Sequence, residues 1–306
     1  MSVSRRARVA TVARCVLHLS VLSLFAPVTF AASWQQSVDQ IIGWKGQRMP
    51  DDVLRYTLTP HLNLTVAGVN VKNNLALDGY AAFHPEHSGV LLVAEVVVPQ
   101  DNLDRTVETA TGNNLNVSAV HNHVVKENPR VMFIHLSGFG DPATLAKELK
   151  NVIASAGLSL HHDDDEQDGD DVTPGLDVGR LESIMGASST PVDGVLEFTF
   201  DRTESFTLGS HQLPSAMGPE SEIHFQSIGN GPAAQVTELA LTQSEVPTAL
   251  RILRAHGQHI AVTALHNHFI NEQPRLFFVH TWGVGSATEL ASAIRDVLNH
   301  TAVMPE

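Results

Sequence analysis

The chain contains one histidine-rich stretch twice, and this internal repeat constrains the fold more than any other sequence feature. Each copy has a His-Asn-His triplet, then a glutamate, a Pro-Arg pair, a phenylalanine, a third histidine and two glycines, all displaced by 145 positions without a gap. Such a repeat indicates two homologous domains in the 306-residue chain. The first copy comprises His121, Asn122, His123, Glu127, Pro129, Arg130, Phe133, His135, Gly138 and Gly140. The second comprises His266, Asn267, His268, Glu272, Pro274, Arg275, Phe278, His280, Gly283 and Gly285.

The elements expected around each copy follow one order. Val90 to Val98 is an apolar, β-branched run typical of a buried strand, and Asp101 is a suitable N-cap for a helix that ends near Gly112. A histidine strand, a turn, a return strand and a helix capped by Asp141 follow. The order β-α-β-β-α predicts an α+β fold of two tandem, ferredoxin-like α/β sandwich repeats with antiparallel sheets. An earlier strand would supply the last strand of each sandwich, and a pseudo-twofold axis would relate the repeats.

The N-terminal residues have the features of a secretory signal. Four arginines precede an apolar run from Val16 to Phe30, and Ala31 ends a small-residue cleavage site. We therefore expect an exported protein, periplasmic or secreted, without a stable membrane span after the signal is removed, because the apolar run is short. The expected segments are a signal peptide at 1–31, a first repeat at 34–157, an acidic flexible linker at 158–176 and a second repeat at 177–303.

Composition narrows the classes of function. The only cysteine is Cys15, inside the expected signal, so the mature chain would have no thiol for disulfides, nucleophilic catalysis or metal binding. Removing residues 1–31 takes away four of the 19 basic residues and none of the 33 acidic ones, which changes the net charge from −14 to −18. Such a chain repels nucleic acid. The sequence also lacks a dinucleotide fingerprint, a phosphate loop and a serine nucleophile elbow, so no nucleotide cofactor is expected.

The repeated histidines are the best candidates for a site. On a strand, residues i and i+2 point to the same face, so the two histidines of each triplet would project together, with the third beside them on the return strand. Neutral imidazoles suit zinc, copper, nickel or iron, and the spacing does not choose among these divalent transition metals. Glu95 and Glu238 on the buried strands are alternative further ligands. The candidate metal ligands are His121, His123, His135, His266, His268, His280, Glu127 and Glu272.

Other residues of the motif have both functional and structural interpretations. Arg130 and Arg275 would either bind a carboxylate or phosphate of a ligand or pair with the nearby glutamate and close the hairpin. Trp282, which replaces Ser137 of the first copy, would line a ligand pocket or belong to the core. The histidines themselves would be metal ligands or hydrogen-bonded core groups.

The stretch from Val262 to Gly283, with its His-Asn-His, Glu-x-Pro-Arg and Phe-x-His-x-Trp-Gly patterns, resembles the LppY/LpqO family of secreted bacterial proteins. The resemblance covers most of residues 34–303. It implies an exported bacterial protein built on a duplicated domain of unknown function, and it supplies no reaction. The triplet and glutamate of each copy also match the first half of a cupin motif, which leaves a bicupin as an alternative fold.

Three functions remain open from the sequence. The first is binding of a metal ion or small molecule at the cell envelope through the histidine hairpins. The second is a metal-dependent periplasmic hydrolase or oxidase that uses the same histidines. The third is a structural envelope protein with core histidines. The residues do not decide whether the chain is an enzyme, which repeat is functional, or what the oligomeric state is.

Overall fold

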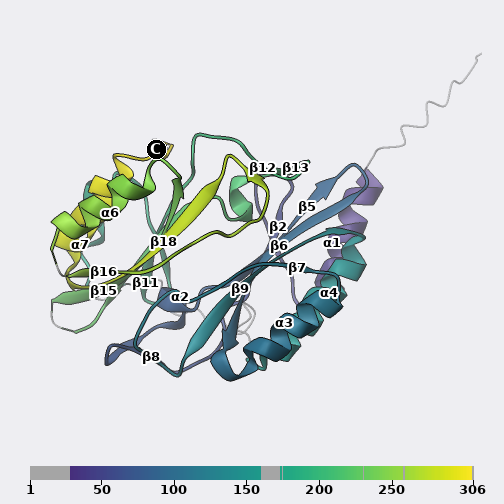
Figure 1. The fold of residues 1–306 in the computed structure, drawn as a ribbon, viewed down its shortest axis with the longest axis horizontal. Helices are drawn as coiled ribbons and strands as arrows, with labels where there is room; N and C mark the ends of the chain where they lie inside the picture. The colour runs from purple at the N-terminus through teal and green to yellow at the C-terminus, as the bar shows by residue number, and fades with distance from the viewer. Residues whose placement is uncertain (1–27, 160–172, 174, 230, 258, 305–306) are drawn as a thin grey trace, which may run out of the picture.

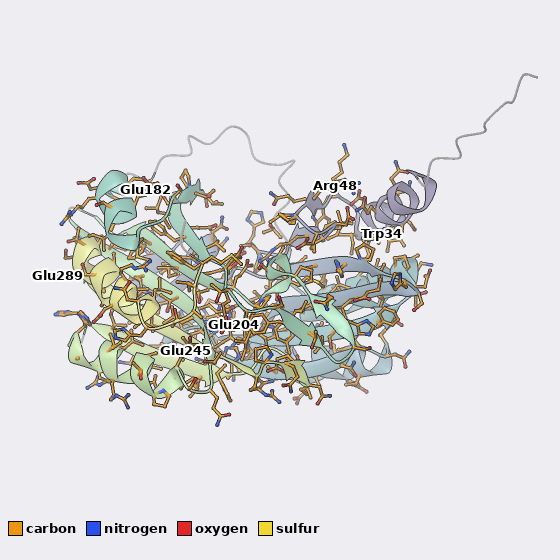
Figure 2. All side chains as sticks on the ribbon, turned by 90° about the horizontal axis from the view of Figure 1, so that it is seen from above. Trp34, Arg48, Glu182, Glu204, Glu245 and Glu289 are labelled. Carbon is orange, nitrogen blue, oxygen red and sulfur yellow. The ribbon has the colours of Figure 1, made fainter. Side chains whose placement is uncertain are left out.

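Two similar α+β halves pack together through their sheets (Figure 1). The computed structural model describes residues 28–159, 173, 175–229, 231–257 and 259–304. Most of the expected signal peptide and of the acidic linker therefore lies outside the described residues. Helices cover the outer face of each sheet, so the order of layers is helices, sheet, sheet, helices. Figure 2 shows α1 and α7, marked by Trp34 and Glu289, at opposite ends of the molecule.

The first repeat forms a six-stranded antiparallel sheet with three long helices on one face. The strands follow the order β1-β2-β5-β6-β9-β7. They are β1 (Gln47–Arg48), β2 (Leu54–Thr57), β5 (Tyr80–Glu86), β6 (Gly89–Pro99), β7 (Asn116–His121) and β9 (Val131–Gly140). The helices are α1 (Val28–Ile42), α3 (Leu103–Gly112) and α4 (Pro142–Ala156), with a short 3-10 turn η1 (Gln100–Asn102) before α3. As expected, Asp141 caps α4 by accepting a hydrogen bond from the Thr144 N–H at 2.8 Å.

The second repeat has the same architecture. Its strands follow the order β10-β11-β14-β15-β18-β16. They are β10 (Thr190–Val192), β11 (Val195–Phe200), β14 (Ser221–Ser227), β15 (Pro232–Thr242), β16 (Ile260–His266) and β18 (Leu276–Ser286). The helices are α5 (Val178–Met185), α6 (Val246–Ala255) and α7 (Ala287–Leu298), and a 3-10 turn η3 (Ser215–Met217) precedes β14.

Each sheet confirms the ferredoxin-like prediction at its centre. The order β5-β6-β9-β7 is that of a ferredoxin-like sheet in which β5, an earlier strand, takes the place of the missing last one. In the second repeat β14 takes this place beside β15. Both sheets are open and covered by helices, so the bicupin alternative, which requires two barrels, is wrong.

Two small sheets hold the tips of the histidine hairpins. In each of them a short strand after the His-Asn-His triplet pairs with a hairpin that precedes the large sheet's central strands. The turn expected between the histidine strand and its return strand therefore contains a short strand in each repeat. One small sheet comprises β3 (Leu64–Val66), β4 (Val69–Val71) and β8 (Glu127–Asn128), and the other β12 (Phe206–Leu208), β13 (His211–Leu213) and β17 (Glu272–Gln273). A one-turn helix, α2 (Asn73–Ala76), follows β4.

Apolar side chains fill the spaces between the layers. One core lies between the first sheet and α1, α3 and α4, and includes Trp34, Leu136 and Leu149. A second lies between the other sheet and α5, α6 and α7, and includes Ile294. Two further clusters mix residues of both repeats, which shows that the inner faces of the sheets pack on each other. None of the helices in the described part of the chain is both long and apolar enough to span a lipid bilayer.

Candidate metal centre between the repeats

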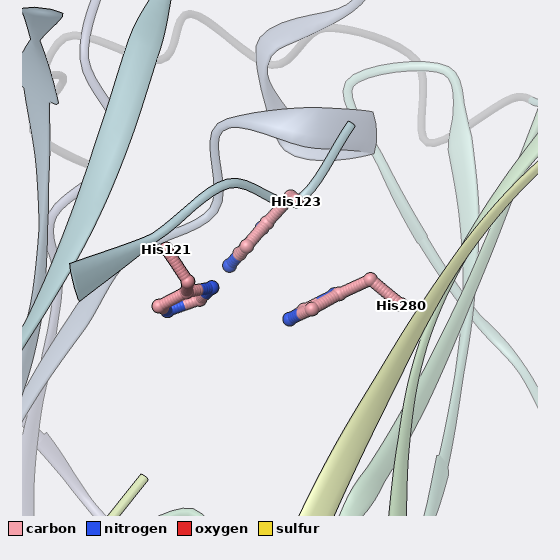
Figure 3. Close-up of side chains that lie close together, drawn as sticks. All are labelled: His121, His123 and His280. Atoms are coloured by element: carbon pink, nitrogen blue, oxygen red, sulfur yellow. The ribbon is translucent and has the colours of Figure 1, made fainter. Parts of the chain in front are cut away.

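The six histidines of the two motifs come together in one buried cluster between the sheets. His121, His123 and His135 of the first repeat face His266, His268 and His280 of the second. Figure 3 shows the rings of His121 and His123 close to that of His280, which comes from β18 of the other repeat. The side chain of His266 is partly buried and the other five histidines are buried. The two histidine sets therefore share one site.

The rings meet across the interface in a symmetric pattern. His121 and His266, which are equivalent residues of the two repeats, stack with ring centroids 3.6 Å apart. His123 stacks on His280 at 4.1 Å, and the equivalent pair, His268 and His135, at 3.9 Å. A pair of equivalent residues in mutual contact must lie on the axis that relates the repeats. The pseudo-twofold axis therefore passes between His121 and His266.

A glutamate from the central strand of each repeat contacts histidines of the same repeat, three in the first and two in the second. In the sheets, Glu95 is directly opposite His135, and Glu238 is directly opposite His280. One oxygen of Glu95, Oε1, lies 3.3, 2.9 and 3.2 Å from the Nε2 atoms of His121, His123 and His135. Glu238 lies 3.2 Å from His268 and 3.4 Å from His280. The sequence interpretation of these two glutamates as further ligands agrees with this placement.

Burial keeps several of the imidazoles neutral. It lowers the pKa of His121 to about 3, and burial together with the nearby His121 lowers the pKa of His266 to about 2. Burial also lowers the pKa of His268 and of His280 well below its ordinary value. A neutral imidazole has a lone pair on one ring nitrogen, and that is the form that binds metals.

The two glutamates differ in their electrostatics. Burial raises the pKa of Glu95, but the facing His135 and His123 lower it by more than burial raises it. The net pKa of Glu95 is therefore well below the usual value. Burial, followed by repulsion from Glu95, raises the pKa of Glu238 well above its usual value. In the absence of a cation, the centre therefore favours one ionised and one protonated carboxyl group.

The second histidine of each triplet is not on a strand, contrary to expectation. β7 ends at His121 and β16 ends at His266, so His123 and His268 lie beyond the strands. Strand alternation therefore does not orient the pair. Instead, Asn122 turns the chain: its side-chain amide donates a hydrogen bond to the carbonyl of Val124 at 3.0 Å.

The glutamates and arginines of the hairpin turns lie apart from this cluster. Glu127 pairs with Arg130 at 3.4 Å, and Glu272 pairs with Arg275 at 3.1 Å. Among the described residues, neither glutamate belongs to a group of histidine and acidic side chains whose ligand atoms lie within 4.8 Å of one another. This placement matches the structural alternative for the arginines, in which they close the hairpin.

The phenylalanine of each repeated motif stacks on a histidine ring of the cluster. Phe133 stacks on His123 with centroids 3.4 Å apart, and the equivalent Phe278 stacks on His268 at 3.3 Å. The structure thus gives the repeated phenylalanine a role that sequence reasoning had missed, although its recurrence in the motif was a signal. Trp282 is buried and belongs to a mixed apolar cluster between the sheets.

Three polar residues near the cluster carried no sequence signal. Asp78, Glu222 and His224 place ligand atoms within 4.8 Å of one another. None of the three belongs to a motif, and Glu222 and His224 are not repeated, because Tyr80 and Ala82 occupy the equivalent positions in the first sheet.

One known protein family matches the chain by sequence. The family described as "Domain of Unknown Function (DUF1259)" matches it twice, at residues 36–155 and 179–300. No curated protein matches the chain.

Solved structures show only weak similarity. EtuB from Clostridium kluyveri is 9% identical over 83% of this chain and 88% of its own, with a TM-score of 0.21. TP0453, in its crystal form III, is 14% identical over 73% and 82%, with a TM-score of 0.19. The trimeric bacterial microcompartment shell protein PduB is 12% identical over 84% and 93%, with a TM-score of 0.20. At these TM-scores the similarities support no argument about this chain.

Proposed function

Because the chain belongs to the family described as "Domain of Unknown Function (DUF1259)", whose description names no activity, we propose a function from the site alone. The protein binds a transition-metal ion in the histidine cluster between its two repeats. Both repeats contribute ligands, and Glu95 and Glu238 complete the donor set. Imidazole and carboxylate donors of this kind suit zinc, copper, nickel or iron.

One observation carries the proposal: buried imidazole nitrogens in the cluster have no hydrogen-bond partner. Buried polar atoms in proteins are nearly always hydrogen bonded, so a group of unpartnered ones calls for an explanation. A bound metal ion supplies it, whereas a purely structural role for the histidines would require partners. Among the described residues of the cluster, the atoms without a hydrogen-bond partner are Nδ1 and Nε2 of His121, His135 and His268, and Nε2 of His266 and His280. Four of these Nε2 atoms lie 3.2–3.4 Å from Glu95 or Glu238 without hydrogen-bond geometry.

The spacing of the donor atoms also supports a metal. Metal–ligand bonds of about 2.0–2.1 Å at angles of about 90–109° place two ligands of one ion roughly 2.9–3.4 Å apart. The distances between the glutamate oxygens and the histidine Nε2 atoms range from 2.9 to 3.4 Å. Only the 2.9 Å contact between His123 and Glu95 has hydrogen-bond geometry. The remaining contacts fit ligands that share an ion.

Hydrogen bonds from the outer ring nitrogens prepare two histidines for this role. Nδ1 of His280 lies 3.1 Å from the carbonyl oxygen of Thr237, and Nδ1 of His266 lies 3.1 Å from that of Asn267. An Nδ1–H that donates to a carbonyl fixes the tautomer in which Nε2 carries the lone pair. In both residues Nε2 has no hydrogen-bond partner, and Nε2 of His280 lies 3.4 Å from Oε2 of Glu238.

The space beside the cluster favours binding of an ion over turnover of an organic substrate. The cavity that His123, His280, Glu95 and Glu238 help to line has a volume of about 20 Å³. This is about the volume that one water molecule requires, whereas sites for small-molecule ligands usually have several hundred Å³. A hydrolase or oxidase with a larger substrate would need a different conformation of this region.

Export, and kinship with the LppY/LpqO proteins, form part of the same proposal. The support is the basic and apolar sequence of residues 1–31 and the repeated hairpin motif. Helix α1 begins at Val28, so cleavage after Ala31 would remove its first four residues. Fractionation of a bacterial host, with mass spectrometry of the mature N-terminus, tests the export: full-length chain found only in the cytoplasm would refute it.

Elemental analysis of the full chain tests the metal site. After purification without chelators and incubation with zinc, copper, nickel or iron salts, we expect about one or two ions per chain. The variant H123Q/H268Q, which removes one equivalent histidine from each repeat, should lose this metal while circular dichroism shows that it stays folded. Glutamine keeps the polarity of the site and removes the imidazole ligand.

A matched control changes two exposed histidines, one in each half of the chain. H87Q/H300Q should keep the full metal content, since His87 and His300 lie at the surface. The proposal fails if the wild-type protein takes up none of the four metals. It also fails if H123Q/H268Q, still folded, retains as much metal as H87Q/H300Q.

A further inference from the structure

A second group of potential ligands lies between the sheets, outside the histidine motifs. Asp78, which precedes β5, meets Glu222 and His224 of β14, and their ligand atoms lie within 4.8 Å of one another. The group therefore combines donors from both repeats. Two carboxylates and one imidazole provide harder, more oxygen-rich ligands than the histidine cluster does.

His224 is the residue of this group that points to a ligand. It is only 7% exposed and it lines the cavity. Within the described part of the chain, no hydrogen bond or ion pair to its imidazole is present. An imidazole with little exposed surface that faces a cavity and has no hydrogen-bond partner can offer a ring nitrogen to a ligand there.

The two carboxylates are already held in position by neighbours. The Thr59 hydroxyl donates a hydrogen bond to Oδ1 of Asp78 at 2.9 Å. Arg55 contacts Oε1 of Glu222 at 3.4 Å and makes a shorter ion pair, 2.8 Å, with Glu220. Each carboxylate of the group has a second oxygen available for a cation, and such outer contacts orient ligands in known metal sites.

Equivalent positions of the two sheets carry opposite charges beside this group. Arg55 is opposite Ala82 in the first sheet, and Glu197 is opposite His224 at the equivalent place in the second. The first repeat thus supplies a built-in positive charge where the second supplies another carboxylate.

The same small cavity adjoins both groups of ligands. Asp78, Glu222 and His224 line it together with Glu95, His123 and Glu238 of the histidine centre. Its volume of about 20 Å³ admits a water-sized species. A dehydrated ion beside one group would therefore have the other group as its neighbour.

We propose that Asp78, Glu222 and His224 form a second divalent-cation site, separate from the histidine cluster and selective for oxygen-preferring ions such as Mn²⁺ or Fe²⁺. The site does not depend on metal binding by the histidine cluster, because its three ligands are distinct from the six repeated histidines. Glu95 and Glu238 connect the two sites electrostatically.

Titration of the chelator-treated full chain with Mn²⁺, followed by the electron paramagnetic resonance of free Mn²⁺, tests this proposal. The double variant D78N/H224Q should bind about one Mn²⁺ per chain fewer than the wild-type protein, or bind it at least about tenfold more weakly. H123Q/H268Q should keep this Mn²⁺. A loss in D78N/H224Q alone would thus establish the second site even if the histidine cluster binds no metal.

A surface Asp–His pair provides the matched control. Asp296 and His256 lie 3.0 Å apart at the surface, and D296N/H256Q should bind Mn²⁺ as the wild-type protein does. If D78N/H224Q does not fold, the isosteric single variant D78N serves in its place. The proposal is overturned if the folded D78N/H224Q or D78N protein binds Mn²⁺ with wild-type stoichiometry and affinity.

Discussion

Asn122 and Asn267 make the same pair of hydrogen bonds from equivalent positions in the two repeats. The amide of Asn122 donates to the carbonyl of Thr263 at 3.3 Å, and that of Asn267 donates to the carbonyl of Ser118 at 3.1 Å. The hydroxyl groups return this contact: Ser118 donates to the carbonyl of His268, and Thr263 to that of His123. The middle residue of each His-Asn-His triplet thus joins the hairpins whose histidines form the central cluster.

Replacement of one asparagine should weaken the interface. Asn122→Ala removes the bond to Thr263 and the bond to Val124, and we expect a loss of about 1–3 kcal/mol in the free energy of unfolding, since each hydrogen bond contributes about 0.5–1.5 kcal/mol. Urea denaturation of the metal-free protein measures this loss. Asn116→Ala, at an exposed position of β7, should change stability by less than about 0.5 kcal/mol. Equal effects of both substitutions would show that Asn122 does not join the repeats.

Glu238 should lower the stability of the metal-free protein and raise its affinity for metal. Burial and the neighbouring Glu95 raise its pKa well above the usual value, so its ionisation in the folded protein is unfavourable at neutral pH. The stabilising contribution of such a group is complete below its unfolded-state pKa and decreases as the pH rises toward the folded-state value. Glu238→Gln should therefore raise the melting temperature of the metal-free protein at pH 7 by about 2 °C or more, and by less near pH 4.5.

The same substitution should have the opposite effect on the metal. Glutamine cannot supply the negative charge that Glu238 offers to a cation, so metal affinity should fall at least about tenfold. Differential scanning fluorimetry and metal titration on one preparation measure both effects. A variant that is less stable without metal, or that binds metal as tightly as the wild-type protein, would contradict this assignment.

Acid should destabilise the metal-free protein through the buried histidines. The pKa of His266 is about 2 in the folded state and about 6.5 in an unfolded chain, so between these values the unfolded state binds more protons and stability rises with pH. At about 1.4 kcal/mol per pH unit, His266 should cost about 2 kcal/mol between pH 7 and pH 5. His266→Gln should remove that part of the loss. Urea titrations at the two pH values measure it, and identical losses in both proteins would refute the prediction.

Much of the fold could be predicted because it depends on local patterns. The apolar run of β6, the cap at Asp141 and the repeated hairpin specify the order of elements, and the need for a strand beside β6 is met by β5. The small sheets around β8 and β17 were not predicted. They pair strands of only two or three residues over long sequence distances, and no local pattern reports such pairing.

The residues of the histidine site could be predicted from the sequence, but their meeting in one cluster could not. The repeat identified all six histidines, whereas their meeting in one cluster depends on how the two sheets pack. Glu127 and Glu272 seemed suitable ligands because they are near the histidines in sequence, but each one pairs with the arginine three residues later. Asp78 and His224 could not be found, because side chains that meet only through tertiary packing leave no spacing in the sequence.

If both repeats build one metal centre, histidines from different repeats should depend on each other for metal affinity, which a double-mutant cycle measures. His123 and His280 come from different repeats, and their rings stack with centroids 4.1 Å apart. Metal titration of H123Q, H280Q and the double variant should give losses in binding free energy that are not additive, because the two residues contact the same centre. Additive losses, or no loss in either single variant, would contradict the account.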